Sequence, residues 1–139
     1  MSQIISAYKY LLNEGVIHRD IKPANILRVG NRWKISDFGF AAKARFGFKD
    51  RVNVGTPLYM APESLRRNFY SFKSDLYSIG IVMFEMLMGN TPYEAKSEKE
   101  LIEKVSNEIP IPQSIKNPKM IELFSKLTTF SDAKRLTKE

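Results

Sequence analysis

The sequence contains no cysteine, one histidine and one tryptophan. Without cysteine the chain can form neither a disulfide framework nor a zinc site built on thiolates, which fits an intracellular protein, and we expect a cytoplasmic one. The sequence also lacks an apolar run long enough to span a bilayer, and its first residues do not follow the charged-then-apolar pattern of a signal peptide. We therefore expect no membrane span and no secretory leader.

The charge balance is basic, with a net charge of +7. Basic chains can bind nucleic acid, membrane surfaces or acidic proteins, so a nucleic-acid or membrane binder is one hypothesis for this chain. Lys and Arg are scattered along the sequence, however, and no aromatic RNA-binding motif accompanies them. The pattern favours a solvated basic surface with no specific nucleic-acid partner. The 139 residues, 43% of them hydrophobic, suffice for one globular domain with its own core.

One short segment carries a carboxylate, a cation and an amide at fixed offsets, in the sequence His18-Arg19-Asp20-Ile21-Lys22-Pro23-Ala24-Asn25. Four more motifs follow in order: Asp37-Phe38-Gly39, Gly55-Thr56-Pro57, Ala61-Pro62-Glu63, and a polar-acidic-hydrophobic run at Asp75. In type, order and spacing this set resembles the Ser/Thr protein kinase family, and the resemblance covers nearly the whole chain. One such motif can arise by chance, whereas five in order do not.

The resemblance implies a catalytic role for this first segment. Asp20 is expected to accept or orient the proton of a substrate hydroxyl. Lys22 is expected to place positive charge beside the transferring phosphoryl group and so to contact ATP as well. Asn25 and Asp37 offer the hard oxygen ligands that Mg²⁺ prefers, with the phosphates of ATP completing the shell. Leu27 is expected to form the lower wall of the adenine site.

Other matched residues are expected to support the site. By the resemblance, His18 packs against Phe38 and is not an acid or base, and Arg19 is the partner of a phosphate on the activation loop. Thr56 is expected close to Asp20, and its presence favours Ser/Thr specificity.

Three further residues, Glu63, Asp75 and Arg135, are expected to hold the fold together. By the resemblance, Asp75 reaches back to the backbone of the catalytic loop. Glu63 and Arg135 are expected to form a buried ion pair.

The predicted activation loop, residues 40–54, contains no Ser, Thr or Tyr. It therefore offers no residue for phosphorylation, although Arg19 implies a phosphate-binding site. Either other contacts hold the loop, or Asp50 substitutes weakly for the phosphate; it is equally open that Asp50 is simply exposed. Phe40, a bulky residue directly after the Asp-Phe-Gly motif, implies by the resemblance a preference for Ser over Thr in the substrate.

The expected fold is mainly α, of the α+β kind that the resemblance implies. Apolar residues on all sides predict a buried central helix over about residues 75–88, with its N-cap at Ser74 or Asp75 and its end at Gly89. Periodicity and turn signals predict the remaining elements over residues 2–14 (helix), 26–35 (β-hairpin), 97–108 (helix) and 118–129 (helix).

The resemblance implies that residues 1–139 are the C-terminal lobe of a kinase domain, with a catalytic loop at 18–25 and an activation segment at 37–63. The sequence has no glycine-rich loop and no ATP-anchoring strand lysine, so we expect the N-terminal lobe to be absent. The first hypothesis is a Ser/Thr protein kinase in truncated form, with protein substrates and with weak or no activity alone. The alternative is a lobe-only, non-catalytic protein that binds other kinase domains or regulatory partners.

Overall fold

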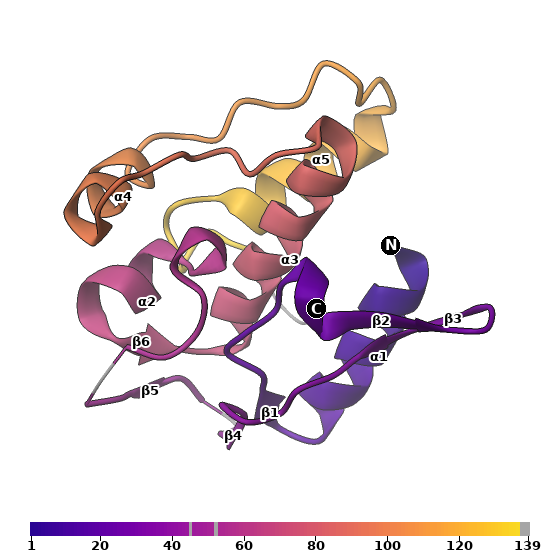
Figure 1. Cartoon of the computed structure of the whole chain (residues 1–139), viewed down its shortest axis with the longest axis vertical. Helices are drawn as coiled ribbons and strands as arrows, with labels where there is room; N and C mark the ends of the chain where they lie inside the picture. The colour runs from indigo at the N-terminus through magenta and orange to yellow at the C-terminus, as the bar shows by residue number, and fades with distance from the viewer. Residues whose placement is uncertain (45, 52, 137–139) are drawn as a thin grey trace.

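The computed structural model describes residues 1–44, 46–51 and 53–136. Its central element is helix α3 (Phe72–Met88), around which the other helices are arranged (Figure 1). Helix α5 (Pro118–Thr128) packs along α3, and helix α1 (Ser2–Asn13) joins both through a shared apolar cluster. Helices α2 (Pro62–Arg67) and α4 (Glu98–Lys104) complete the helical part.

Two apolar clusters meet at α3. In one, Ile81 of α3 packs with Phe124 of α5 and with residues of α2 and α4. In the other, Ile79 and Val82 of α3 pack with Tyr8 of α1. Because α3 presents apolar residues to both clusters, it is buried over most of its length, as the all-round hydrophobic pattern predicts.

The start of α3 differs from the prediction. The helix begins at Phe72, and the N-cap is neither Ser74 nor Asp75. Ser71 is the N-cap: its side chain accepts a hydrogen bond from the backbone of Lys73 at 3.2 Å, and the Ser74 hydroxyl accepts one from the backbone of Ser71 at 3.1 Å. Two serines three residues apart thus form a reciprocal capping box, which satisfies more free donors than a single later cap would.

The end of α3 is the predicted one. Gly89 follows the last helical residue with a φ of 80°, a left-handed conformation that glycine adopts without strain. The prediction of a buried helix up to this point is wrong for the last turn, because Met86, Leu87 and Met88 are exposed. These side chains extend past the two apolar clusters.

The strands form three antiparallel pairs: β1 (Val16–Ile17) with β4 (Ala42–Lys43), β2 (Ile26–Val29) with β3 (Arg32–Ile35), and β5 (Phe48–Lys49) with β6 (Phe69–Tyr70). The β2–β3 pair is the predicted hairpin, with Gly30 at the turn. Short 3₁₀ turns lie at Pro23–Asn25 and Pro57–Tyr59. A mainly helical fold with a few short antiparallel strands is therefore confirmed.

The predicted helices outside α3 are present with one difference in length. Helices α1 and α5 begin and end within one residue of the predictions. Helix α4 ends at Lys104, short of the predicted residue 108, and the buried residues Val105 and Ile109 lie in the turn and the loop that follow it.

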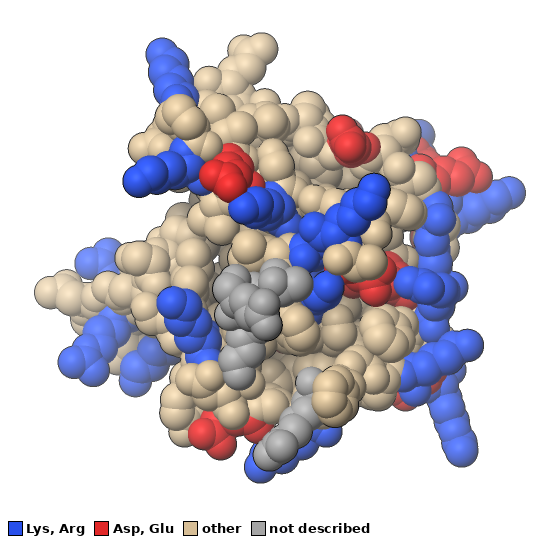
Figure 2. Space-filling view, turned by 180° about the vertical axis from the view of Figure 1, so that it is seen from behind, with Lys and Arg blue, Asp and Glu red and all other residues tan. Residues whose placement is uncertain are grey.

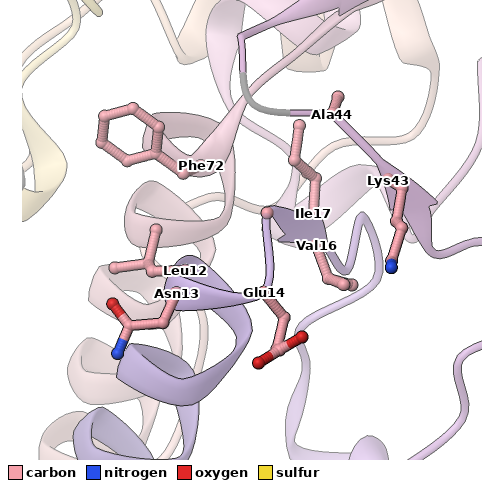
Figure 3. Close-up of a pocket in the computed structure, with 9 residues that line it drawn as sticks. Leu12, Asn13, Glu14, Val16, Ile17, Lys43, Ala44 and Phe72 are labelled. Carbon is pink, nitrogen blue, oxygen red and sulfur yellow. The ribbon is translucent and has the colours of Figure 1, made fainter.

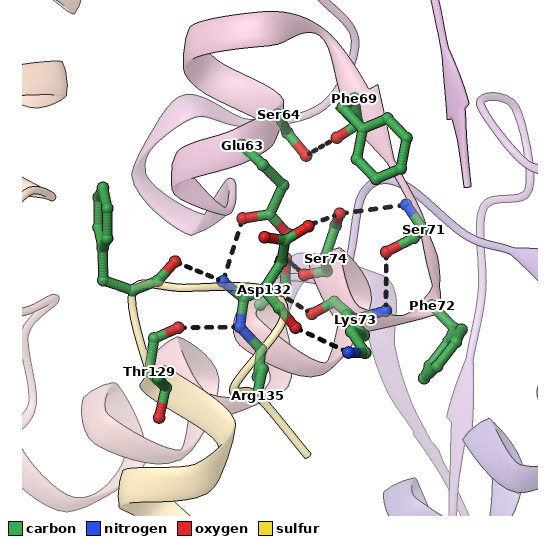
Figure 4. A network of polar contacts seen from close by, with 12 residues as sticks. Glu63, Ser64, Phe69, Ser71, Phe72, Lys73, Ser74, Thr129, Asp132 and Arg135 are labelled. Carbon is green, nitrogen blue, oxygen red and sulfur yellow. Dashed lines mark hydrogen bonds and ion pairs between the residues drawn. The ribbon is translucent and has the colours of Figure 1, made fainter. Parts of the chain in front are cut away.

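Arg135 ties the C-terminal part of the described chain to α2 and α3 (Figure 4). Its guanidinium contacts both carboxylate oxygens of Glu63, at 2.6 and 3.0 Å, and the two side chains are 0% and 2% exposed. The guanidinium also donates to the backbone oxygen of Thr129 and lies over the ring of Tyr77. Ser74 donates a third hydrogen bond to Glu63, so both charges are compensated within the core.

The surface charges are dispersed on the face shown in Figure 2, where Asp and Glu side chains lie among the Lys and Arg side chains. Within the described residues, no helix has the length and apolar character needed to cross a membrane.

Candidate functional site

The side chains of Asp20, Lys22 and Thr56 form one hydrogen-bonded cluster. Thr56 Oγ1 donates to Asp20 Oδ1 at 2.7 Å, and Lys22 Nζ donates to Thr56 Oγ1 at 2.7 Å. Lys22 Nζ also lies 3.2 Å from Asp20 Oδ2. A carboxylate, a cation and a hydroxyl from two segments far apart in sequence are thus brought within contact distance.

Gly55 allows this close approach of the activation segment to the catalytic loop. Its φ is 109°, and a Cβ at this position would lie 2.5 Å from the backbone oxygen of Arg19. Only glycine has both the conformation and the space that this crossing requires. The Gly-Thr order then directs the side chain of Thr56 toward Asp20.

Asn25 and Asp37 flank the β2–β3 hairpin, and Ser36, directly before Asp37, donates a backbone hydrogen bond of 2.9 Å to the backbone oxygen of Asn25. The amide nitrogen of Asn25 donates to the backbone and side-chain oxygens of Asp20, at 2.8 and 3.1 Å. Because the nitrogen of the Asn25 amide is used in these bonds, the amide oxygen is the atom that can face a cation. Asp37 adds an exposed carboxylate.

These two oxygen donors fit a magnesium ion that is also bound by phosphate. Mg²⁺ usually binds one or two protein oxygens, keeps several waters and takes its remaining ligands from substrate phosphates. Among the described residues, no group of three or more His, Cys, Asp and Glu side chains could hold a metal ion alone. Asn25 and Asp37 are therefore the candidate ligands of a shared Mg²⁺–nucleotide site.

His18 uses both ring nitrogens inside the protein. Nε2 lies 3.0 Å from the backbone oxygen of Ser36, and Nδ1 accepts from the backbone of Asp20 at 3.2 Å. The ring contacts Phe38 edge-to-face with centroids 5.0 Å apart. With a donor and an acceptor both engaged, the imidazole positions the loop and has no nitrogen left to exchange protons with a substrate.

Asp75 connects α3 to the catalytic loop. Its Oδ2 accepts from the backbone of His18 at 2.7 Å, and its Oδ1 accepts from the backbone of Arg19 at 2.9 Å. Arg19 has a φ of 70°, a left-handed conformation that costs a non-glycine residue about 1–2 kcal/mol. Burial raises the pKa of Asp75, while the two backbone hydrogen bonds lower it. The carboxylate thus stabilises a strained backbone directly before Asp20.

Tyr8 of α1 is a second residue at this junction, and the sequence indicates it only as part of an apolar helix face. Its hydroxyl lies 2.9 Å from the backbone oxygen of Phe72 and 3.1 Å from Asp75 Oδ2. Burial, reinforced by the charge of Asp75, raises the pKa of Tyr8 well above its usual value, so the hydroxyl remains a donor. In the sequence, the role of Tyr8 is marked only by one hydroxyl-bearing side chain on an otherwise apolar helix face.

Arg19 binds an activation-loop carboxylate. Its Nη1 lies 2.5 Å from Asp50 Oδ2, and its Nε donates to the backbone oxygen of Phe40. The guanidinium also lies 5.2 and 5.3 Å from the ring centroids of Phe48 and Tyr70. Of the two interpretations of Asp50, simple exposure is wrong, because the carboxylate is in contact with the arginine that the resemblance assigns to a phosphate.

Other predicted site residues lie at the surface or away from this cluster. Leu27 and Phe38 are about half exposed, at 49% and 48%, so a large part of each side chain is open to solvent. Glu63 and Arg135 contact each other in the core and do not contact Asp20. They belong to the framework of the fold.

A cavity of about 510 Å³ opens at the C-terminal end of α1 and contains none of the predicted site residues (Figure 3). Glu14, Val16, Lys43 and Phe72 are among the residues that line it. The cavity combines one acidic, one basic and several apolar side chains, and it has no arrangement of groups that specifies a ligand.

Together, the cluster of Asp20, Lys22 and Thr56, the hairpin oxygens and the loop anchored by Asp75 form the candidate functional site. The sequence matches the protein kinase domain family over residues 1–139. It is 40% identical over 83% of its length to serine/threonine-protein kinase atg1 of Dictyostelium discoideum, of which it covers 18%. It is 34% identical over its whole length to serine/threonine-protein kinase ATG1c of Arabidopsis thaliana, of which it covers 20%.

A third relative, serine/threonine-protein kinase PLK1 of Xenopus laevis, is 38% identical over 99% of this chain, which covers 23% of it. The chain therefore spans about a fifth of the length of these relatives. It belongs to the eukaryotic Ser/Thr protein kinase family, and it corresponds to part of the kinase domain.

Proposed function

We propose that residues 1–139 form the C-terminal lobe of a Ser/Thr kinase domain and carry residues that transfer the γ-phosphoryl group of ATP to a protein hydroxyl. The observation that carries this proposal is the contact of Asp20 with Lys22 and Thr56 beside Asn25. Phosphoryl transfer needs little covalent chemistry from a protein, so a positioned carboxylate, a cation and metal-binding oxygens are the groups that matter.

Each side chain has a distinct task in this proposal. Asp20 accepts the proton of the substrate hydroxyl while the new P–O bond forms and the bond from the γ-phosphorus to the β,γ-bridging oxygen breaks, leaving ADP. Lys22 neutralises negative charge on the transferring group. Asn25 and Asp37 would hold Mg²⁺, which would neutralise negative charge on the phosphates of ATP. Leu27 contacts the adenine from below.

The substrate is proposed to be a protein with a target Ser in preference to Thr. The exposed side chain of Phe40 lies on the segment that follows Asp37, where extra bulk on the attacking residue would be unfavourable.

The test is phosphoryl transfer by the natural protein from labelled ATP to a Ser-containing peptide. Asp20→Asn removes the proton acceptor and should lower kcat by about 10²-fold or more, with ATP binding retained. Asp132→Asn is the matched control and should leave the rate unchanged, because, among the described residues, only the backbone oxygen of Asp132 takes part in the Arg135 network. Equal rates for Asp20→Asn and Asp132→Asn would contradict the proposal.

A non-catalytic binding lobe is the second candidate. It is favoured by the exposure of Leu27, Trp33, Phe38 and Phe40, apolar side chains from the hairpin and the segment after it. Such a surface suits another kinase domain or a regulatory protein. In that case the natural protein would bind a partner through these residues, and Asp20→Asn would change neither binding nor any transfer of phosphate.

A further inference from the structure

Tyr8 is an inward-facing residue of α1 whose hydroxyl reaches the first turn of α3. The side chain is 2% exposed and lies in the apolar cluster between α1, α3 and α5. A phenylalanine would fill the same space without a polar atom to desolvate. The buried hydroxyl is compensated by its contacts with the Asp75 carboxylate, at 3.1 Å, and with the backbone oxygen of Phe72, at 2.9 Å.

The contact with Asp75 bears on the orientation of that carboxylate. Asp75 can hold the backbones of His18 and Arg19 together only when each of its oxygens faces one amide. The terminal torsion of an aspartate side chain has a broad, two-fold preference, so two acceptor bonds leave it some freedom. A third donor from Tyr8 restricts it, and a carboxylate is a stronger acceptor than the competing carbonyl.

The orientation of Asp75 is passed on to Asp20 through the backbone. Arg19 keeps its left-handed φ of 70° while its amide donates to Asp75, and the next residue is Asp20. The Asp20 amide in turn donates to the ring of His18. A displacement at Arg19 would therefore shift the Asp20 carboxylate relative to the reacting atoms, and small displacements of that kind have large effects on rate.

We propose that Tyr8 is a positioning residue for the catalytic loop: its hydroxyl fixes the Asp75 carboxylate, which fixes the backbone of His18 and Arg19 and so places Asp20. The part of this proposal that concerns rate rests on the proposed phosphoryl transfer, whereas the part that concerns the backbone does not.

The first experiment compares Tyr8→Phe with Tyr10→Phe in the natural protein. Both variants lose one phenolic hydroxyl from the same helix, but Tyr10 is 66% exposed. Tyr8→Phe should lower kcat about five- to twentyfold and leave KM for ATP within about twofold, because it disturbs Asp20 and not the nucleotide contacts. Tyr10→Phe should match the wild type. Equal kcat values for the two variants, or a change in KM alone, would overturn the proposal.

The second experiment measures amide hydrogen exchange in the same proteins and needs no activity. Tyr8→Phe should speed exchange at the amides of His18 and Arg19 by about tenfold, with Ile81 in the middle of α3 unchanged. Faster exchange throughout α1 and α3 would show a general loss of stability and would overturn the positioning role. Unchanged exchange at Arg19 would overturn it as well.

The two readouts separate the two proposals. If the wild-type protein transfers no phosphate but Tyr8→Phe still loosens His18 and Arg19, the proposed function fails and the backbone role of Tyr8 stands. If transfer is present and depends on Asp20 but not on Tyr8, the proposed function stands and the role of Tyr8 is refuted.

Discussion

Single side chains connect parts of this fold that are far apart in the sequence, and Arg135 is the clearest case. It forms a two-point contact with Glu63, 72 residues away in the sequence, in a fully buried position. Removing one partner of such a pair leaves the other charge without compensation, which costs about 3–5 kcal/mol. A domain of this size has only about 5–15 kcal/mol of stability in total.

Arg135→Ala should therefore unfold or aggregate the protein under conditions where the wild type is folded. Thermal and urea unfolding followed by circular dichroism are the measurements. Lys134→Ala removes an exposed neighbouring cation and should unfold at the wild-type midpoint. If both variants unfold together, the Glu63 contact contributes nothing to stability.

Asp50 offers a prediction about the activation loop. Asp50→Asn keeps the shape of the side chain but removes the charge that Arg19 binds at 2.5 Å. A hydrogen bond between charged groups is worth roughly 1.5–3 kcal/mol, of which the half-buried position retains a part. We expect kcat to fall about three- to tenfold and residues Phe46–Arg51 to become more sensitive to proteolysis.

Glu108→Gln is the control for the Asp50 experiment, because it removes an exposed carboxylate outside the activation loop. The same rate and proteolysis pattern in both variants would mean that the Arg19 contact does not order the loop.

Phe40 provides a test of substrate choice. Its bulk should disfavour the extra methyl group of a target Thr, so the natural protein should phosphorylate a Ser peptide faster than the matched Thr peptide. Phe40→Val should raise the relative rate on Thr, measured as the ratio of kcat/KM for the two peptides. A ratio that is unchanged by the substitution would assign the preference to another residue.

At the scale of elements, the packing of α3 against α5 depends on a small residue. A Cβ at Gly80 would lie 2.6 Å from Thr128 Cγ2 and 3.1 Å from Leu127 Cβ. Alanine favours a helix over glycine by about 1 kcal/mol, so helix propensity alone would make Gly80→Ala stabilising. The contact distances predict the opposite.

Gly80→Ala should lower the free energy of unfolding by about 1–3 kcal/mol, the usual cost of overpacking. Thr128→Ser removes the clashing methyl group and keeps the hydroxyl that donates to the Phe124 backbone oxygen. The double variant should therefore regain much of the loss, as judged from urea unfolding midpoints. A more stable Gly80→Ala protein would show that α5 moves aside easily.

At the scale of the whole molecule, the proposed nucleotide site draws on Asp20, Lys22, Asn25 and Asp37, with Leu27 as its one proposed adenine contact. Residues 1–139 expressed alone should bind Mg²⁺–ATP weakly and transfer little phosphate, because open water weakens each electrostatic contact and the adenine meets only one wall. The measurement is label transfer to a Ser peptide, with Asp20→Asn as control. Strong transfer that depends on Asp20 would show that this segment suffices.

The sequence by itself determined the parts of the molecule that depend on a few neighbouring residues. The β2–β3 turn at Gly30, the helix end at Gly89, and helices α1 and α5 follow from backbone preferences and periodicity that act within a few residues. The motif spacing likewise identified the family and the candidate residues from Asp20 to Asp37. The N-cap of α3 was predicted wrongly because Ser71, Ser74 and Asp75 are all good caps, and only the chain's path chooses among them.

Only the tertiary structure decided the partners of Tyr8 and Asp50. Tyr8 and Asp75 lie 67 residues apart and Arg19 and Asp50 lie 31 apart, yet each pair is in contact. A tyrosine on an apolar helix face fits the helical pattern whether or not its hydroxyl has a partner. An aspartate in a loop is equally compatible with a turn, an exposed position and an ion pair. Their partners depend on how α1, the catalytic loop and the activation loop pack around α3, because burial makes an unpaired polar group costly only after the chain has folded.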